Sequence, residues 1–544
     1  MSSDLKEYVV TVKDKKDLDS LYEDIEKLSH GNSCIPDRMV TCCKRRKISR
    51  NTHYLLTAEE AEKLKKDERV KRVSLSPDEL GLVVQPMSVQ SSDFWNKSNT
   101  NDPEHKNWGL LRCVLGEQLP NWGTDDNPNQ SGTINLTSSG KNVDVVIVDG
   151  HFDPDHPEFK ENSDGSGPTR VVQYNWLQHN PEINEEPAGT YTYTPYDNPL
   201  SENNHGAHVA GTVAGNTQGW ARSANIYNIS PYSNNPNNIA PLELIDYIRE
   251  FHKNKPINPV TGRKNPTITN HSWGYSYGHV NFSDITHISY RGNLIEGPFN
   301  AEALKSFGVI PFLPFPLTVS APARFPALDE DIEDAIEDGI IFIGAAGNSG
   351  YKADVPGGID YDNYFIVNST SAYFYHEGSS PGSAANVVCV GSSNTTVEEK
   401  KVDFSVSGPR VDVYAPGVNI MSSFISGGVP DPRDPNYFIS KDTGTSMASP
   451  QVCGIITCLL EQYPHLDQQA VRDYLASYSK YDQLYDDPNS THEDLSVLQG
   501  SENRYLFYYK ERPDSGITTP KLNYQKRPAQ GTTYPRKIIK YYVK

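Results

Sequence analysis

A turn of small residues, Gly-Thr-Ser-Met-Ala-Ser-Pro at positions 444–450, leads directly into an apolar run. The spacing of that run predicts a buried helix with Ser446 at its start, because the apolar residues recur every three to four positions: Val452, Ile455, Ile456, Leu459 and Leu460. A hydroxyl there faces free backbone N–H groups and the positive end of the helix dipole. This position suits a nucleophile whose attack creates an oxyanion. Taken alone, a serine before a helix is more simply an N-cap.

A second position of chemical interest ends a buried strand. Residues 143–148 are rich in β-branched side chains, as in a parallel strand covered on both faces, and Asp149 follows directly. Catalytic groups of α/β proteins gather at the carboxyl ends of such strands. The same stretch allows a metal-binding interpretation, because three aspartates and two histidines lie within eight positions: Asp149, His151, Asp153, Asp155 and His156.

Residues 203–215 read Asn-Asn-His-Gly-Ala-His-Val-Ala-Gly-Thr-Val-Ala-Gly. We expect His205 to start a helix, which the small residues allow to pack closely against the sheet. His205 and His208 are three positions apart, so they share one helix face and could bind zinc. No third ligand follows at a suitable spacing, which favours a packed structural role for His208.

Two further segments place polar groups after strands. Residues 339–350 predict a buried strand that ends in Ala-Ala-Gly-Asn, and the carboxamide of Asn348 could donate to an oxyanion. An asparagine at a strand end is otherwise a turn residue. Residues 270–274, Asn-His-Ser-Trp-Gly, follow another short strand, and an extended peptide could pair beside them through main-chain hydrogen bonds.

Together these motifs resemble those of the subtilisin-like serine proteases, the S8 family. Residues 444–450 are similar to the family's nucleophile motif, residues 149–157 to its aspartate motif, residues 203–215 to its histidine motif, and Ala-Ala-Gly-Asn to its oxyanion motif. The chain order Asp, His, Ser is that of subtilisin. One departure is Gly150-His151, where the family usually has a small residue and then glycine.

The resemblance implies a serine endopeptidase that acts on protein or peptide substrates. It assigns the catalytic triad to Asp149, His205 and Ser446, the oxyanion hole to Asn348, and substrate binding to Ser272, Trp273 and Gly274. The alternatives are a catalytically silent subtilase scaffold that serves as a binding or structural protein, and a metal hydrolase that uses the Asp and His clusters. No cofactor is expected to be required; calcium is common in the family, but its ligands cannot be assigned here.

For the fold, the resemblance implies an α/β catalytic domain of three layers around a mostly parallel sheet, over residues 107–481. Residues 275–328 and 351–385 are expected to be insertions. Residues 1–80 predict a small α+β unit, which resembles the inhibitory propeptide of subtilases; a generic ferredoxin-like module is the alternative. We expect residues 81–106 to be a linker and processing region, and residues 482–544 to be a C-terminal extension.

Charge and composition bear on which binding partners and which cellular location are expected. The net charge of −19 argues against a nucleic-acid binder. Residues 515–544 form a basic tail, which we expect to dock on the acidic body rather than to contact nucleic acid. No apolar run is long enough to cross a bilayer. We see no secretory signal and expect the seven cysteines to be mostly buried free thiols, which favours a cytoplasmic or particle-packaged protein over a secreted one.

Overall fold

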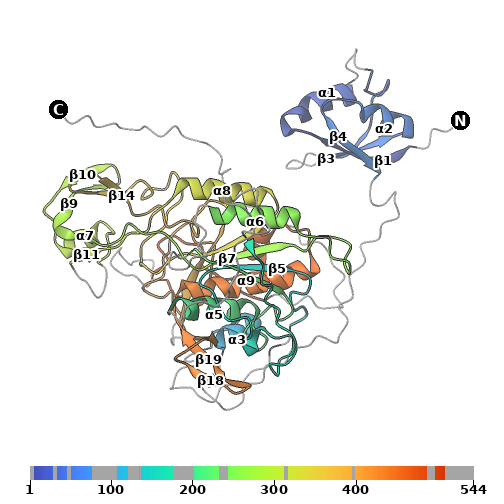
Figure 1. The fold of residues 1–544 in the computed structure, drawn as a ribbon. Helices are drawn as coiled ribbons and strands as arrows, with labels where there is room; N and C mark the ends of the chain where they lie inside the picture. The colour runs from blue at the N-terminus through green and yellow to red at the C-terminus, as the bar shows by residue number, and fades with distance from the viewer. Residues whose placement is uncertain are drawn as a thin grey trace, which may run out of the picture. The chain divides into compact units, whose positions relative to one another are not determined.

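The computed structural model describes residues 5–27, 33–45, 51–75, 107–119, 134, 136–176, 201–231, 243–311, 317–369, 371–394, 399–486 and 497–508. The predicted processing region at 81–106 and the basic tail at 515–544 lie outside this part of the chain. The protein divides into two compact units, residues 1–88 and 89–544, which Figure 1 draws in ribbon form.

The N-terminal unit is a four-stranded antiparallel sheet with two helices. Its strand order is β2-β3-β1-β4. The apolar stripe of α1 packs into the sheet through Leu21 and Ile25, and a capping box formed by Thr57 and Glu60 starts α2. The sequence missed β2, which is only four residues long. The elements are β1 (Lys6–Val12), α1 (Leu18–Lys27), β2 (Cys42–Arg45), β3 (Asn51–Leu56), α2 (Ala58–Leu64) and β4 (Val70–Leu75).

The larger unit is built on an eight-stranded sheet of order β20-β21-β16-β15-β12-β7-β5-β6. Every neighbouring pair in it is parallel except β20 and β21. The predicted α/β fold with a mostly parallel sheet is therefore confirmed. The strands are β5 (Asp144–Val148), β6 (Asn225–Ile229), β7 (Thr267–His271), β12 (Ile341–Ala345), β15 (Val388–Ser393), β16 (Val413–Pro416), β20 (Lys480–Tyr481) and β21 (Arg504–Tyr505).

Helices cover both faces of this sheet, and alternation along the strands divides the core between them. Val145 and Ile147 face one cluster, whereas Val146 and Val148 face the other. Figure 1 shows α6 and α8 on one side of β5 and β7, and α5 and α9 on the other. The helices are α3 (Trp108–Leu115), α5 (Ser201–Ala214), α6 (Glu243–Asn254), α8 (Pro326–Glu337), α9 (Thr445–Gln462) and α10 (Gln468–Tyr478).

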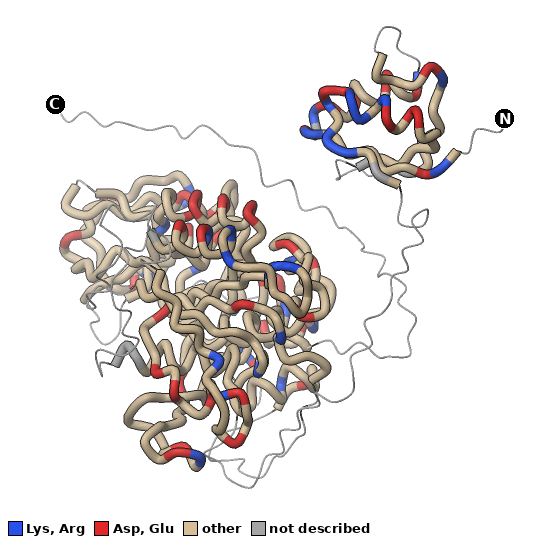
Figure 2. Tube along the Cα trace, turned by 45° about the vertical axis from the view of Figure 1, so that its right-hand side comes forward, with Lys and Arg blue, Asp and Glu red and all other residues tan. Residues whose placement is uncertain are grey.

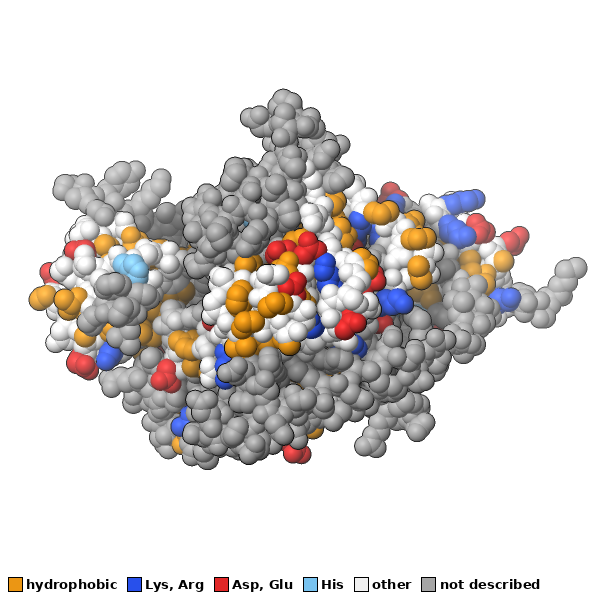
Figure 3. All heavy atoms as spheres, turned by 60° about the horizontal axis from the view of Figure 1, so that its bottom comes forward, with side chains coloured by type: hydrophobic (Ala, Val, Ile, Leu, Met, Phe, Trp, Pro, Cys, Tyr) orange, Lys and Arg blue, Asp and Glu red, His pale blue; other side chains and the backbone are white. Residues whose placement is uncertain are grey.

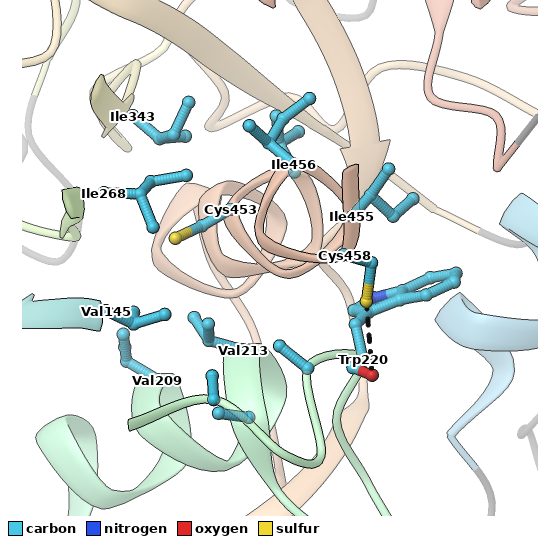
Figure 4. Close-up of a cluster of buried hydrophobic side chains, with 14 of the residues drawn as sticks. Val145, Val209, Val213, Trp220, Ile268, Ile343, Cys453, Ile455, Ile456 and Cys458 are labelled. Carbon is cyan, nitrogen blue, oxygen red and sulfur yellow. Dashed lines mark hydrogen bonds between the residues drawn. The ribbon is translucent and has the colours of Figure 1, made fainter. Parts of the chain in front are cut away.

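Helix α9 lies in the centre of one cluster (Figure 4), as the apolar spacing after Ser446 predicted. Cys453 and Cys458 are fully buried there, and the Cys458 thiol donates to the carbonyl of Trp220. Burial raises the pKa of both thiols above the ordinary value of 9.0. These two cysteines therefore act as packed apolar groups, not as reactive thiolates.

The C-terminal strand extends the sheet beyond the boundary expected at residue 481. β21 pairs with β16 through Tyr414 and Tyr505, and Tyr505 is fully buried. The guanidinium of Arg112, from α3, lies 3.9 Å from the centre of the Tyr505 ring and forms a buried ion pair with Glu399. Residues 497–508 thus belong to the packed body, and no local pattern revealed a strand of two residues.

The two expected insertions fold together as one small layer. Strands from both join in an antiparallel sheet of order β10-β9-β13-β14. A short pair, β8 and β11, lies beside it and shares its apolar cluster. The elements are β8 (Val280–Asn281), β9 (Ile285–Tyr290), β10 (Asn293–Glu296), α7 (Ala301–Ser306), β11 (Thr318–Val319), β13 (Tyr364–Val367) and β14 (Ser371–Phe374).

Acidic residues outnumber basic ones in the chain, which has a net charge of −19. Figure 2 shows red segments gathered on the helical layer that contains α8, whose acidic residues include Asp331 and Asp334. On the face in Figure 3, apolar side chains lie in small groups between charged ones. In the described part of the chain, no helix combines the length and apolar character needed to span a membrane.

A buried ion pair fastens a small antiparallel sheet of order β17-β19-β18, which consists of β17 (Ile420–Phe424), β18 (Val429–Asp431) and β19 (Asp434–Asp442). Glu158 is fully buried, and Arg433 donates to it at 2.5 Å. Burial alone would raise the pKa of Glu158. The charge of Arg433 and hydrogen bonds from Thr217 and Gln218 outweigh burial and lower the pKa to about 2, from 4.5.

We predict that Arg433→Ala lowers the free energy of unfolding by about 3–5 kcal/mol, because it leaves the Glu158 carboxylate buried without its counter-charge. The measurement is chemical denaturation at neutral pH. Arg249→Ala is the matched control: its partners Asp334 and Asp338 are exposed, so the loss should stay within about 1 kcal/mol. Equal losses in the two variants would contradict this account.

The same pair predicts acid sensitivity. The pKa of Glu158 is depressed in the folded protein, so its contribution is complete above the ordinary value of 4.5 and is lost as the pH falls toward about 2. Glu158→Gln should therefore remove part of the decline in stability over this range, measured by thermal unfolding at a series of pH values. An unchanged acid profile would show that Glu158 is not a source of the decline.

Candidate active site

Asp149 follows the last residue of β5 and is fully buried. One carboxylate oxygen, Oδ1, accepts hydrogen bonds from the backbone N–H of Gly150 at 2.7 Å and from Nδ1 of His205 at 2.8 Å. Because a carboxylate can only accept, this contact assigns the His205 proton to Nδ1 and leaves Nε2 as the basic nitrogen. The structure therefore brings together two of the residues predicted from sequence.

Glycine at position 206 allows this contact. A Cβ atom added to Gly206 would lie only 1.9 Å from the carbonyl oxygen of Gly150. Helix α5 can thus approach the loop after β5 only with a residue that lacks a side chain at this point. This close approach explains, on steric grounds, why glycine directly follows His205 in the histidine motif.

The environment of His205 favours its protonated form. The side chain is 30% exposed. Burial of the ring lowers its pKa, but the negative charge of Asp149 and the hydrogen bond to it raise the pKa by more. The result is a pKa above the ordinary value of 6.5. The pair can thus accept and stabilise a proton on the imidazole.

His151, the residue that departs from the family pattern, is accommodated by a polar neighbour. Its Nδ1 lies 2.6 Å from Oδ1 of Asn228 on β6. The amide nitrogen of the same asparagine donates to the carbonyl oxygens of Ile147 and Asp149, at 3.1 and 3.2 Å. Asn228 thus fixes both the bulky ring and the backbone of the turn that presents Asp149.

Ser446 is the second residue of α9, as predicted, and is 9% exposed. Its hydroxyl donates to the carbonyl oxygen of Ser272 at 3.0 Å, and the Ser272 hydroxyl donates to the carbonyl of Ser446 at 2.9 Å. Pro450 explains the second bond. It stands four residues after Ser446 inside the helix and has no N–H, so the Ser446 carbonyl lacks its usual helical donor.

A short chain of side chains continues this link between α9 and the end of β7. Ser449 donates to Oδ1 of Asn270 at 2.8 Å, and Nδ2 of Asn270 donates to the Ser272 hydroxyl at 3.0 Å. All of these groups are buried. The start of α9 is therefore held at a set position relative to the sheet.

Asn348 lies after β12 with its amide orientation determined by Thr445. The backbone N–H and the hydroxyl of Thr445 both donate to Oδ1 of Asn348, at 2.9 and 2.8 Å. An atom that accepts two hydrogen bonds must be the amide oxygen. The amide nitrogen, Nδ2, therefore remains available to donate. A Cβ atom on Gly444 would come within 3.1 Å of Nδ2. Thr445 was not singled out by the sequence reasoning, although it lies in the nucleophile motif.

A pocket of about 200 Å³ lies beside Ser446 and Asn348. Ser272, Trp273 and Gly274, predicted to bind substrate, all line it. Trp273 is half-buried against the apolar cluster around α6 and α8, while Gly274 is exposed. A Cβ atom at position 274 would lie 2.4 Å from Oγ of Ser379, so a larger residue there would require the Ser379 hydroxyl to turn away.

The predicted site residues thus form two groups: Asp149 with His205, and Ser446 with Asn348 and residues 272–274. The bond that would join the groups, from the Ser446 hydroxyl to His205, is not among the hydrogen bonds of the described residues. The hydroxyl points instead to Ser272. Catalytic hydrogen bonds of this kind commonly tighten only when substrate binds.

The histidines of the metal-binding interpretations are engaged elsewhere. His208 is fully buried, with Nε2 at 2.7 Å from the carbonyl oxygen of Ile420. His156 accepts from the N–H of Glu158 and contacts the carbonyl of Phe438 at 2.9 Å. Across the residues that the structure describes, no group of three or more His, Cys, Asp or Glu side chains could hold a metal ion.

Comparison with known proteins gives consistent matches. A sequence profile of the subtilase family matches residues 140–500. The subtilisin-like serine protease Cla h 9.0101 of Davidiella tassiana is 25% identical over 411 residues, which cover 73% of this chain and 58% of that protein. Cerevisin of Saccharomyces cerevisiae is 26% identical over 419 residues, which cover 74% of this chain and 48% of that protein. The match thus spans about half the length of these relatives.

Among solved structures, one of a cold adapted subtilisin-like serine proteinase covers 75% of this chain and all of its own, with a TM-score of 0.44 and 20% identity. The profile match alone extends over more than half of the chain and includes Asp149, His205, Asn348 and Ser446. On this ground, the chain belongs to the subtilase family.

Proposed function

We propose that the protein is a serine endopeptidase that hydrolyses peptide bonds with the triad Asp149, His205 and Ser446. The observation that carries the proposal is the hydrogen bond of 2.8 Å between buried Asp149 and Nδ1 of His205. It leaves Nε2 as a base whose conjugate acid is stabilised. A silent scaffold is not favoured, because the chain retains all four residues of the proposed chemistry, Asp149, His205, Asn348 and Ser446.

In the proposed mechanism, the Ser446 hydroxyl turns from the Ser272 carbonyl toward Nε2 of His205 and attacks the peptide carbonyl. His205 takes the hydroxyl proton and later gives it to the leaving amine, while Asp149 holds the tautomer and stabilises the imidazolium. The backbone N–H of Ser446 and Nδ2 of Asn348 bind the oxyanion. Water then hydrolyses the acyl-enzyme by the same proton transfers.

Substrate would bind along Ser272, Trp273 and Gly274. These residues line the pocket next to Ser446, and Gly274 is exposed. A peptide backbone extended beside them would gain affinity through main-chain hydrogen bonds. All the groups of this mechanism belong to the chain itself, so we propose that no cofactor is required for the reaction.

We further propose that the N-terminal unit is an intramolecular inhibitor and that the protein is made as a zymogen. Two features support this proposal: residues 1–88 form a compact unit of their own, and the polar, turn-rich stretch at 81–106 separates that unit from the motifs. Cleavage in that stretch would release the inhibitor.

Ser446→Ala should abolish both labelling by a fluorophosphonate probe and hydrolysis of unfolded casein, with a rate loss of roughly 10⁴-fold or more. Ser283→Ala, at an exposed serine outside the pocket, is the control and should retain both. Hydrolysis that persists in Ser446→Ala and is lost on chelation would favour a metal hydrolase instead.

The rate should depend on the ionisation of His205. Only the neutral imidazole can accept the serine proton, so kcat/KM should rise with pH through a midpoint above 6.5, the ordinary pKa that Asp149 raises. Asp149→Asn should lower both the rate and the midpoint, because the raising charge is lost. If the midpoint is the same in Asp149→Asn as in the wild type, the pH dependence does not arise from the Asp149–His205 pair.

Processing should depend on the same serine. Purified wild-type protein should lose its N-terminal unit by a cut within residues 81–106, whereas Ser446→Ala should stay intact. Mass spectrometry of both proteins over a time course measures this. Wild-type protein that is labelled by the probe and yet keeps its full mass would contradict the zymogen proposal.

A further inference from the structure

The turn after β5 contains a histidine that the proposed mechanism does not use. His151 follows Asp149 by two residues and is only 8% exposed. Its ring reaches across to β6, where Nδ1 lies 2.6 Å from Oδ1 of Asn228, a residue that is buried as well. A buried polar pair thus stands directly beside the carboxylate proposed to stabilise the imidazolium of His205.

The position of Asn228 in the sheet explains what its amide can reach. Asn228 stands opposite Ile147 in the parallel pairing of β6 with β5. Its Nδ2 donates to the carbonyl oxygens of Ile147, Asp149 and Gly150, at 3.1, 3.2 and 3.4 Å. One amide group therefore follows the backbone from β5 into the turn that carries the Asp149 side chain.

These contacts determine the direction of the hydrogen bond to His151. Because carbonyl oxygens surround Nδ2 of Asn228, that atom must be the nitrogen, and the other end of the amide must be the oxygen. An amide oxygen can only accept, so Nδ1 of His151 carries the proton and donates it. Without this donor, a buried amide oxygen would lose its hydrogen bond, and the amide would lose the contact that opposes its rotation away from the turn.

Helix α5 contacts the same stretch of backbone. Gly206 packs against the carbonyl oxygen of Gly150, which Asn228 also contacts from β6. The N–H of Gly150 donates in turn to Oδ1 of Asp149 at 2.7 Å, and this oxygen is the one that accepts from His205. A rotation of the backbone at this point would therefore displace the acceptor on which the orientation of His205 depends.

His151 supplies its hydrogen bond without adding a charge. Burial lowers the pKa of His151 below the ordinary value of 6.5, although the hydrogen bond to Asn228 opposes this effect. The ring is thus neutral at neutral pH. A positive charge two residues from Asp149 would weaken the attraction of that carboxylate for a proton on His205. A neutral donor at position 151 leaves this attraction intact.

We propose that His151 and Asn228 are positioning residues of the active site: His151 holds the amide of Asn228, and Asn228 holds the turn that aims Asp149 at His205. This inference rests on the proposed protease function. The bulky residue at position 151 is then one half of a complementary pair, whose other half lies on the neighbouring strand.

The first test compares variants that remove or keep the donor at position 151. His151→Phe keeps a ring of similar size that cannot donate, whereas His151→Asn places an amide nitrogen near the position of Nδ1. His151→Phe should lower kcat for a peptide nitroanilide by about tenfold or more while KM stays within about twofold, because a misplaced carboxylate affects the reaction more than binding. His151→Asn should restore most of kcat.

The second test removes the other partner. Asn228→Ala should lower kcat about as much as His151→Phe does, because the turn then lacks its support from β6. Asn225→Ala is the matched control: Asn225 lies on the same strand and donates to Asp144, at the start of β5, at 2.8 Å. This control should leave kcat nearly unchanged. The double variant His151→Phe/Asn228→Ala should lose no more kcat than Asn228→Ala alone, since the two residues act as one unit.

The pH dependence gives a readout that a merely structural role would not move. Asp149 and, from β19, Asp442 both raise the pKa of His205, while buried His208 lies on the next turn of α5 with its own pKa lowered to about 4. A misaligned Asp149 would raise the pKa of His205 by less. The acid midpoint of kcat/KM should therefore move to lower pH in His151→Phe and Asn228→Ala, and should match the wild type in His151→Asn and Asn225→Ala.

Circular dichroism verifies that each variant is folded, and titration with the fluorophosphonate counts active sites. Folded, fully labelled His151→Phe and Asn228→Ala with the kcat and midpoint of the wild type overturn this inference alone. An equal loss of kcat in Asn225→Ala or His151→Asn also overturns it. If Asn228→Ala does not fold, the comparison of His151→Phe with His151→Asn decides. A wild-type protein that is neither labelled nor active overturns the protease proposal, and this inference with it.

Discussion

The hydrogen bond between Asp149 and His205 depends on a close approach of helix to sheet. Gly206 packs so closely on the carbonyl of Gly150 that the Cβ atom of any other residue would overlap the carbonyl oxygen. That contact sets the depth of α5 over the end of β5, and with it the reach of the His205 ring. Asn228 supports the same turn from β6 by donating to two of its carbonyl oxygens. The pair is thus positioned by backbone packing rather than by the flexibility of its side chains.

The other half of the site is positioned by a different device, a helix with a missing hydrogen bond. Pro450 leaves the carbonyl of Ser446 without its helical donor, and the Ser272 hydroxyl takes that place. The cost of a proline inside α9 is therefore offset by a contact that joins the helix to the end of β7. Since Thr445 orients Asn348 from the same turn, one short segment places both the nucleophile and the proposed oxyanion donor.

Most of the residues predicted from sequence end a strand or begin a helix with a local pattern of its own. His205 is the exception: it was expected to start its helix, but α5 begins at Ser201 and His205 lies one turn inside it. Asp149 follows a β-branched run, Asn348 follows a buried strand, and Ser446 lies at the start of an apolar helix. Ser320 and Ser379 have no such pattern. They line the pocket only because segments far apart in sequence pair there, and pairing between distant segments is not encoded in the periodicity of either one. The sequence also did not predict the pairing of β21 with β16 or the ion pair of Glu158 with Arg433, because both join segments that are far apart in the chain.

Glu158 connects the stability of the unit to the geometry of the site. It lies in the one-turn helix Pro157–Phe159, just after the turn that presents Asp149, and accepts hydrogen bonds from Thr217 and Gln218, just after α5. Arg433 joins the small sheet β17-β19-β18 to Glu158, and Ser422 of β17 donates to the carbonyl of His208 in α5. A charge buried at this depth is costly unless it is fully paired. The three segments that meet at Glu158 must therefore assemble together, and two of them directly flank the elements that bear Asp149 and His205.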